Sequence, residues 1–260
     1  MPRQIVAIVA GTCLPGVLLF LVCAIKGMRR FGALGLWLVG WGLVFAHMKQ
    51  VFVMLHPPRP WRGSGLRRPR VEKTPFPSAS TLTQLIRSRR TVYAFRPERA
   101  PRGALDRALD AARWAPNHRL TEPWRFYVLG PDTAEAVCAL NAQRVERKKG
   151  PKAAADKLAR WRTMPGWAVV TCQSSPDPIQ AREDYGACCC AVQNLMLCLW
   201  AEGIGSKWNT GGVIRDPGFY DLIWADPAVE TVVALLWYGY PAEVPTTQRK
   251  ALAEVCVDLP

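Results

Sequence analysis

Residues 187–201 read ACCCAVQNLMLCLWA, the most informative stretch of the chain for its fold. It is apolar almost all round and belongs to a longer helical segment, residues 181–202. A helix that is apolar on every side is buried rather than half-exposed. The stretch is shorter than the ~20 apolar residues that cross a bilayer, and Gln193-Asn194 interrupts it. It therefore predicts a central helix that is fully enclosed in a protein core.

The segments on both sides of this helix alternate between helical and extended patterns. A capping box, Thr81-Leu-Thr-Gln84, is expected to open one helix. Pro101 is expected to start a second, because proline is favoured at the first helical position. Its apolar stripe is Leu105, Ala108, Leu109 and Ala112, and Ala115-Pro116 ends it.

The remaining elements complete the prediction of an α+β fold. Apolar runs predict strands at residues 125–129, 167–171 and 231–240. Two charged helices, at residues 134–148 and 153–162, are expected to form a cover or lid. The sequence thus predicts a layered α+β fold with a central mixed or antiparallel sheet and a buried central helix. About 180 residues suffice for one such core.

The charge distribution divides the chain into two parts. The 260 residues contain 34 Lys and Arg against 20 Asp and Glu, a net charge of +14. Residues 1–75 hold eleven of the basic residues and one acid, Glu72, giving +10. The remainder holds 23 basic and 19 acidic residues, giving +4. The excess charge is therefore not a basic face on the globular part, and no nucleic-acid partner is expected.

A membrane anchor is predicted within residues 1–55. Residues 5–25 form an uncharged stretch of 21 residues, long enough to span a bilayer. A cleaved signal peptide is the alternative, but no small-x-small cleavage site precedes Lys26. A second apolar stretch, residues 31–48, leaves open whether there are one or two transmembrane helices.

The basic residues that follow indicate the orientation of this anchor. Positive charge collects on the cytoplasmic side of membrane spans, which places everything after residue 56 in the cytoplasm. We expect a bacterial inner-membrane protein. Residues 56–78, rich in Pro, Gly and Arg, are expected to be a linker, and residues 79–260 the globular domain.

The sequence offers few side chains in arrangements that would catalyse a reaction. Cys188, Cys189 and Cys190 point about 100° apart on a helix, so they cannot converge on one metal ion. They are interpreted as small buried hydrophobic residues of a reducing compartment. Gly203-Ile-Gly205 follows a helix, whereas a dinucleotide-binding loop follows a strand. A chain without a nucleophile or a metal site either binds a ligand or uses the chemistry of a cofactor.

Four segments carry a more specific signal. They are Ser88-Arg-Arg-Thr91, Ala115–Trp124 (APNHRLTEPW), Asp184–Gly211 and Gly239-Tyr-Pro-Ala-Glu243. In order and spacing they resemble the nitroreductase family of FMN-dependent oxidoreductases, and in particular a compact bacterial branch of it. The resemblance runs from about Leu82 to the C-terminus.

The resemblance implies a homodimer with FMN at the interface, where both subunits contribute contacts. It implies that NAD(P)H is the electron donor. A small organic acceptor (a nitroaromatic, quinone or enone) would be reduced by two-electron, ping-pong hydride transfer. The alternative is a flavin-binding, non-catalytic membrane-associated sensor or partner module. That alternative is motivated by Trp114 and Asn209, which stand where this branch has arginines.

The resemblance also assigns residues to the cofactor. The Arg-Arg-Thr element would hold the FMN phosphate and ribityl chain, and paired guanidiniums suit a dianionic phosphate. No catalytic side chain and no metal is expected, because the flavin carries the chemistry. The residues assigned to FMN are Arg89, Arg90, Thr91, Asn117, His118, Trp208, Asn209, Thr210 and Arg249.

Overall fold

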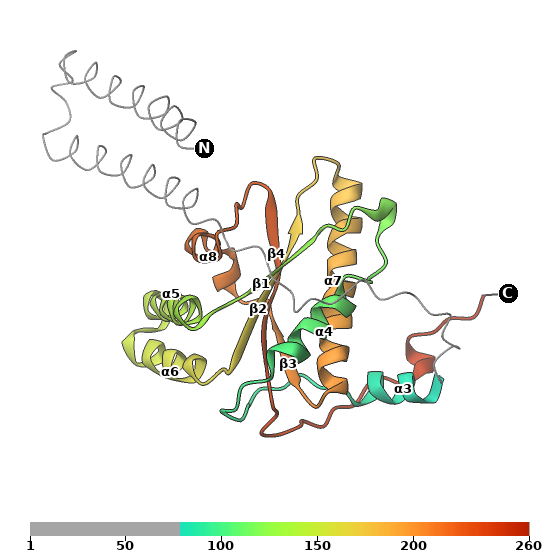
Figure 1. The fold of residues 1–260 in the computed structure, drawn as a ribbon, viewed down its shortest axis with the longest axis horizontal. Coiled ribbons are helices and arrows are strands. Elements are labelled where there is room, and N and C mark those ends of the chain that lie inside the picture. Colours follow the sequence, from blue (N-terminus) through green and yellow to red (C-terminus); the bar gives the residue numbers. More distant parts are fainter. Residues whose placement is uncertain (1–78, 260) are drawn as a thin grey trace, which may run out of the picture. The chain divides into compact units, whose positions relative to one another are not determined.

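The computed structural model describes residues 79–259 (Figure 1). The predicted membrane anchor (1–55) and linker (56–78) lie outside the described residues. The helices are α3 (Ala79–Ser88), α4 (Arg102–Ala112), α5 (Pro131–Lys149), α6 (Pro151–Arg162), α7 (Pro178–Ala201) and α8 (Pro217–Ile223). The strands are β1 (Trp124–Val128), β2 (Gly166–Gln173), β3 (Gly205–Asn209) and β4 (Glu230–Gly239). Short 3-10 helices are η1 (His118–Leu120), η2 (Gly212–Arg215) and η3 (Leu252–Glu254).

The four strands form one sheet in the order β1-β2-β4-β3, and all three pairings are antiparallel. The two central strands are buried on both faces because their side chains alternate across the sheet. On β2, Ala168 and Val170 enter one core, whereas Trp167 and Val169 enter the other. The antiparallel form of the predicted sheet is therefore confirmed.

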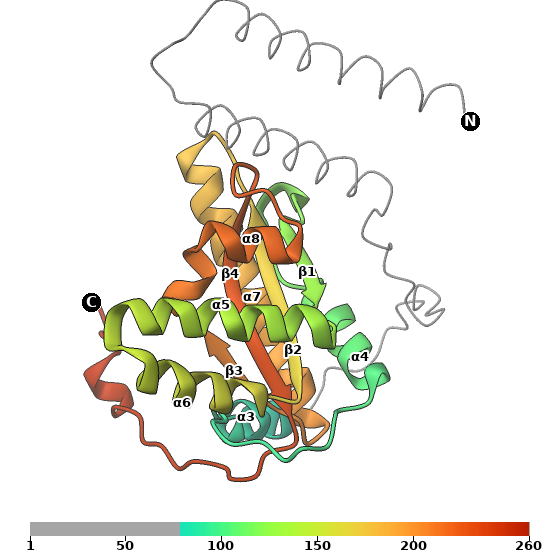
Figure 2. The same ribbon diagram turned by 90° about the vertical axis from the view of Figure 1, so that its left-hand side faces the viewer.

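Helices cover both faces of the sheet (Figures 1 and 2). Helices α4 and α7 pack on one face, and α5, α6 and α8 on the other. Gly150, at φ 84°, makes the sharp turn between α5 and α6, a backbone conformation that favours glycine. Val137 and Trp161 of these two helices are buried. The two charged helices that were expected to form a cover or lid are therefore packed on the sheet as a layer of the fold.

Two predictions about helices were wrong. Helix α7 is not enclosed: Ala191 and Leu195 are fully buried, but Cys190 is exposed and Leu197 is half-buried on the other side. The sheet and α4 cover one face of this helix. Within residues 79–259, η1 and α3 add contacts near its two ends, and Cys190 between them is left exposed. The capping box is also absent, because α3 already includes Ala79, which leaves Thr81 inside the helix.

Most other elements lie where the sequence places them. Pro101 is the N-cap of α4, and Leu105, Ala108, Leu109 and Ala112 are all buried. The short strand β3 and helix α8 were not predicted. Asp216 caps α8 by accepting a hydrogen bond from the Gly218 amide at 3.0 Å. Within residues 79–259, no helix combines the length and apolar character that a bilayer crossing requires.

Candidate functional site

The Arg89–Thr91 segment is anchored to both the central helix and the sheet. It follows α3, whose last residue, Ser88, accepts a hydrogen bond from the Trp200 indole of α7 at 2.9 Å. Thr91 pairs with Ser206 in a parallel bridge, and the Val92 amide donates to the Ser206 carbonyl at 3.0 Å. These contacts fix the segment between the C-terminal end of α7 and the start of β3.

Three guanidiniums share this region. Burial, followed by the charges of Arg249 and Arg90, lowers the pKa of Arg89 below its ordinary value. None of the three forms an ion pair with a carboxylate within residues 79–259. Arg90 donates only to the backbone carbonyls of Arg87 and Arg89, at 2.5 and 2.9 Å. Arg89 and Arg90 are half-buried, whereas Arg249 is exposed. A group of cations without a counter-charge is suited to receive an anion.

The loop that carries Asn117 and His118 is strained. Arg119, Leu120 and Glu122 have φ values of 59°, 53° and 44°, in the left-handed region that glycine favours. Each such residue costs about 1–3 kcal/mol, so the surrounding contacts must hold the loop in place. The Leu120 side chain is 80% exposed, which means that its own burial does not compensate the cost.

Hydrogen bonds to the first half of α7 hold this loop. His118 Nδ1 lies 2.6 Å from Glu183 Oε2, and the Thr121 hydroxyl donates to Asp184 at 2.6 Å. Asp184 is 5% exposed and also accepts from Gln180 at 2.9 Å. Within the loop, the Glu122 amide donates to Asn117 Oδ1 at 3.0 Å. The side chains of Asn117, His118 and Thr121 therefore have partners inside the chain.

The residues at the end of β3 have a mainly internal role. The Trp208 indole donates to the Val233 carbonyl at 3.0 Å, and the Asn209 amide donates to the Leu235 carbonyl at 3.2 Å. Both side chains thus fasten β3 to β4. Thr210 follows the strand and is exposed. From this set, the backbone and the Thr210 side chain remain available to a ligand.

The structure separates six of the nine predicted site residues into two groups. Arg89–Thr91 and Arg249 belong to the end of α7 near Trp200, whereas Asn117 and His118 belong to the end near Glu183. Glu183 and Trp200 are seventeen positions apart, which is about 25 Å along an α-helix. A single chain therefore does not bring all nine predicted residues to one place.

Lys207, a charged residue beside this region, was not predicted from the sequence as part of the site. The ammonium of Lys207 lies 4.8 Å from the Tyr93 ring centroid and 4.7 Å from that of Trp237. Its pKa is lowered by burial and then by the charges of Arg160 and Lys157. A lysine inside the short run Gly205-Ser-Lys-Trp-Asn209 was the available signal, because strand alternation places it on the opposite face from Trp208.

Comparison with known proteins defines the class. The model of the nitroreductase family matches residues 86–240, and the chain belongs to this family. Among particular relatives, YfhC of Bacillus subtilis, named as a candidate NAD(P)H nitroreductase, is 30% identical over 175 residues. That match covers 66% of this chain and 90% of YfhC.

Solved structures agree with this assignment. A nitroreductase-like family protein from Bacillus cereus has a TM-score of 0.61 at 30% identity, covering 72% of this chain and 99% of that one. The FMN-dependent nitroreductase NfnB of Mycobacterium smegmatis, solved in complex with NADPH, has a TM-score of 0.58. At 17% identity, over 70% of this chain and 99% of NfnB, that likeness concerns the fold alone.

Proposed function

We propose that this protein is a membrane-tethered, FMN-dependent oxidoreductase that uses NAD(P)H to reduce a small organic acceptor. The observation that carries the proposal is the group of three guanidiniums, Arg89, Arg90 and Arg249, which have no carboxylate partner within the described part of the chain. Membership of the nitroreductase family supports the reaction class.

The donor set fits the phosphate of FMN. Guanidiniums bind phosphate oxygens in a bidentate manner, and the Thr91 hydroxyl adds a donor next to them. Binding a dianion relieves the mutual repulsion that lowers the pKa of Arg89. When bound, FMN supplies two-electron hydride chemistry between NAD(P)H and an acceptor such as a nitroaromatic, quinone or enone.

The protein's own residues would position the cofactor and shape its surroundings. Arg89, Arg90, Thr91 and Arg249 would fix the phosphate end. The backbone of the segment after β3, together with Thr210, would lie near the flavin ring. The strained loop would present His118 from a rigid base, because Asp184 and Glu183 hold it against α7.

The separation of the two groups along α7 supports a homodimer with FMN between its subunits. In such a dimer, the Arg89 group of one subunit would be completed by the His118 loop of the other. The uncovered face of α7 and helix α3, which has no buried residue, offer the surface for this contact. Leu82 and Ile86 of α3 are 47% and 49% exposed, which is unusual for the apolar stripe of a helix.

The dimer can be tested through Cys190. In a single chain, this thiol is exposed on the open face of α7. The thiol of Cys256, in the C-terminal tail, is exposed too. If a second subunit covers α7, alkylation of Cys190 in the native protein is much slower than alkylation of Cys256, and the two rates become similar in urea. Equal native rates, or a monomer by sedimentation, would exclude this interface.

The membrane and cytoplasmic assignments rest on residues 1–78, which lie outside the described residues. The proposal is that residues 1–55 anchor the protein and that the domain from residue 79 faces the cytoplasm. Recovery of the full chain in the membrane fraction, with residues 79–260 accessible to protease only after the inner membrane is opened, would support it. Recovery of the full chain without detergent would contradict it.

The central experiment is anaerobic reduction of the full-length protein. Purified protein reconstituted with FMN should lose its visible flavin absorbance on addition of NADH or NADPH and recover it on addition of a quinone or nitroaromatic. A protein that binds FMN but is not reduced by either nucleotide would favour the alternative, a non-catalytic flavin-binding module. A protein that does not bind FMN would contradict both.

A further inference from the structure

The β3–α8 turn (residues 210–216) is held by a charged side chain from α5. Arg144 of α5 forms an ion pair with Asp216 at the end of the turn, and their side chains are only 25% and 16% exposed. The same guanidinium also lies against the start of η2. A Cβ atom on Gly212 would be 3.2 Å from Arg144 Nη2, which is closer than ordinary van der Waals contact. One arginine therefore contacts this turn at two places.

Asp216 joins three elements through its two carboxylate oxygens. Oδ2 accepts a hydrogen bond from Arg144 Nη1, and Oδ1 accepts one from the Gly218 amide at the start of α8. The hydrogen bond from Arg144 is the main cause of the lowered pKa of Asp216. The carboxylate is therefore ionised at neutral pH, and α5, the β3–α8 turn and α8 meet at this side chain.

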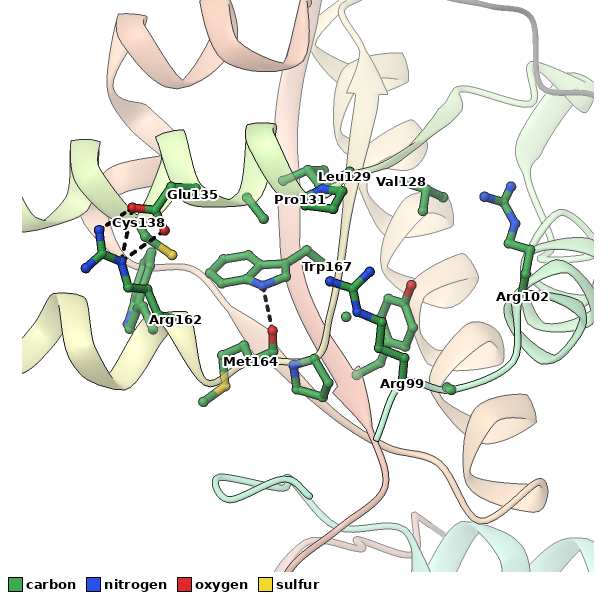
Figure 3. A pocket seen from close by; sticks show the side chains of 17 residues that line it. Arg99, Arg102, Val128, Leu129, Pro131, Glu135, Cys138, Arg162, Met164 and Trp167 are labelled. Carbon is green, nitrogen blue, oxygen red and sulfur yellow. Dashed lines mark hydrogen bonds and ion pairs between the residues drawn. The ribbon is translucent and has the colours of Figure 1, made fainter. Parts of the chain in front are cut away.

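Helix α5 gives Arg144 a fixed base. Val137 and Cys138 of α5 are buried in the core that α5, α6 and α8 form with the sheet. Near the start of the helix, Glu135 pairs with Arg162 at the end of α6 (Figure 3). Because the backbone of Arg144 belongs to a packed helix and its guanidinium is paired, the side chain fixes the distance between α5 and the turn.

The exposed part of the β3–α8 turn is mainly backbone. Thr210, Gly211 and Gly212 are exposed, whereas Val213 and Ile214 are buried. A Cβ atom on Gly211 would meet nothing within 4 Å, and neither glycine has a positive φ. The backbone conformation therefore does not require glycine at these positions, but the missing side chains let a flat ligand approach the peptide groups closely.

We propose that Arg144 is a positioning residue for the flavin. Its ion pair with Asp216 and its contact with Gly212 hold the backbone of residues 210–212 against the flavin ring. This role rests on the proposed function, because it requires FMN beside the turn. Arg144 does not contact the reacting atoms and acts through the turn alone. Hydride transfer needs close and aligned partners, so a misplacement of about 1 Å can slow it by about 100-fold.

Arg144→Met in the full-length protein tests the proposal with and without FMN. Without FMN, hydrogen exchange should become faster in residues 210–216, because the Ile214 and Asp216 amides, which donate to carbonyls inside the turn, would open more often. With FMN, the visible spectrum of the bound flavin should shift, and anaerobic reduction by NADH or NADPH should slow by about 10- to 100-fold. FMN affinity should change much less, because the arginines assigned to the phosphate are intact.

Three companion variants separate positioning from charge. Asp216→Asn keeps an oxygen for the Gly218 amide but loses the ion pair, so it should reproduce the effects of Arg144→Met, and the double variant should be no slower than either single one. Arg144→Lys keeps the charge and should recover part of the rate. Arg147→Met is the matched control, because Arg147 is an exposed arginine of α5 that acts on Asp216 only through its charge. Neither hydrogen exchange nor the flavin should change in it.

Thermal melting shows whether each variant is folded, and Asp216→Asn carries the comparison if Arg144→Met is not. Unchanged hydrogen exchange in the turn would overturn the proposal. Faster exchange with an unchanged flavin spectrum and rate would overturn it too, because the ion pair would then be purely structural. Equal effects of Arg144→Met and Arg147→Met would assign the result to overall charge. A wild-type protein that does not bind FMN is a separate result, which contradicts the proposed function and with it the role of Arg144 toward the flavin.

Discussion

The two ends of α7 differ: one is surrounded by unpaired positive charge, and the other by a strained loop. At the Trp200 end, Arg89, Arg90 and Arg249 place three positive charges together without a carboxylate partner in the described part of the chain. At the Glu183 end, the side chains of His118 and Thr121 are paired, but the backbone of their loop is strained. One end therefore lacks a counter-charge, and the other stores conformational energy.

This difference indicates the role of each end. A surplus of charge is satisfied by a ligand, so the Trp200 end should lose binding when it is mutated. A strained loop held by internal bonds should lose stability first and binding second. Substitutions at the two ends should therefore differ in whether they change FMN affinity or the free energy of unfolding.

The double substitution Arg89→Ala, Arg249→Ala should have the largest effect. Each guanidinium that bonds a charged phosphate contributes about 1.5–3 kcal/mol, so FMN affinity should fall by at least ~100-fold. Flavin fluorescence titration measures this. The apoprotein should be no less stable than the wild type, because the change removes repulsion. Arg113→Ala, at an arginine paired with Asp110, is the matched control.

Unchanged FMN affinity in the double variant would contradict the assignment of the cation group to the phosphate. A large loss of apoprotein stability would show instead that these arginines hold the C-terminal segment in place.

Asp184→Ala should produce the next largest effect, this time on stability. The substitution leaves the Thr121 hydroxyl and the Gln180 amide without their shared acceptor, at a cost of about 2–3 kcal/mol in the free energy of unfolding. Asp184→Asn, which keeps an acceptor oxygen, should recover a substantial part. Urea denaturation of the apoprotein measures both. Equal stability of the Ala and Asn variants would mean that the hydrogen bonds to Asp184 do not hold the loop.

Leu120 tests the backbone strain itself. Because Leu120 is exposed and has a positive φ, Leu120→Gly should be tolerated, whereas a β-branched Leu120→Val should cost about 1–2 kcal/mol more. The difference between the unfolding free energies of the two variants measures the cost of the positive φ for a side chain that is branched at Cβ. The pair Thr231→Gly and Thr231→Val, at an exposed position of β4 where the backbone is extended, is the control, and there valine should be the more stable of the two. Equal stability of the two Leu120 variants would show that the loop relaxes without cost.

The sequence predicted those features that depend on local patterns. The apolar stripe of α4, the long strands β2 and β4 and the position of α7 follow from periodicity that packing reinforces. The five-residue β3 escaped prediction because Gly205-Ser-Lys has little strand character, and only pairing with β4 makes it a strand.

The limits at the candidate site have a similar origin. Motif order indicated Arg89, Arg90 and His118, but not that Asn209 binds the Leu235 carbonyl or that His118 and Arg89 lie at opposite ends of one helix. Those facts depend on how distant segments pack. The prediction of an enclosed α7 failed for a related reason: an apolar surface in the sequence does not say whether the same chain covers it.

Arg107 gives the smallest expected effect and the sharpest contrast with Arg89. It also lies near the end of α7, but it is paired with Glu202 through Nε at 2.9 Å and Nη2 at 2.5 Å. This bond lowers the pKa of Glu202, so its stabilising contribution is present at neutral pH and is lost as the pH falls through the acid range. Arg107→Gln should therefore destabilise the protein slightly at pH 7, and this destabilisation should shrink as the pH falls through the acid range in which Glu202 takes up a proton. FMN affinity should not change, because a guanidinium that already has its carboxylate offers nothing to a phosphate. A fall in FMN affinity comparable to that of the Arg89 variant would mean that general positive charge at this end of α7, rather than the unpaired group, attracts the cofactor.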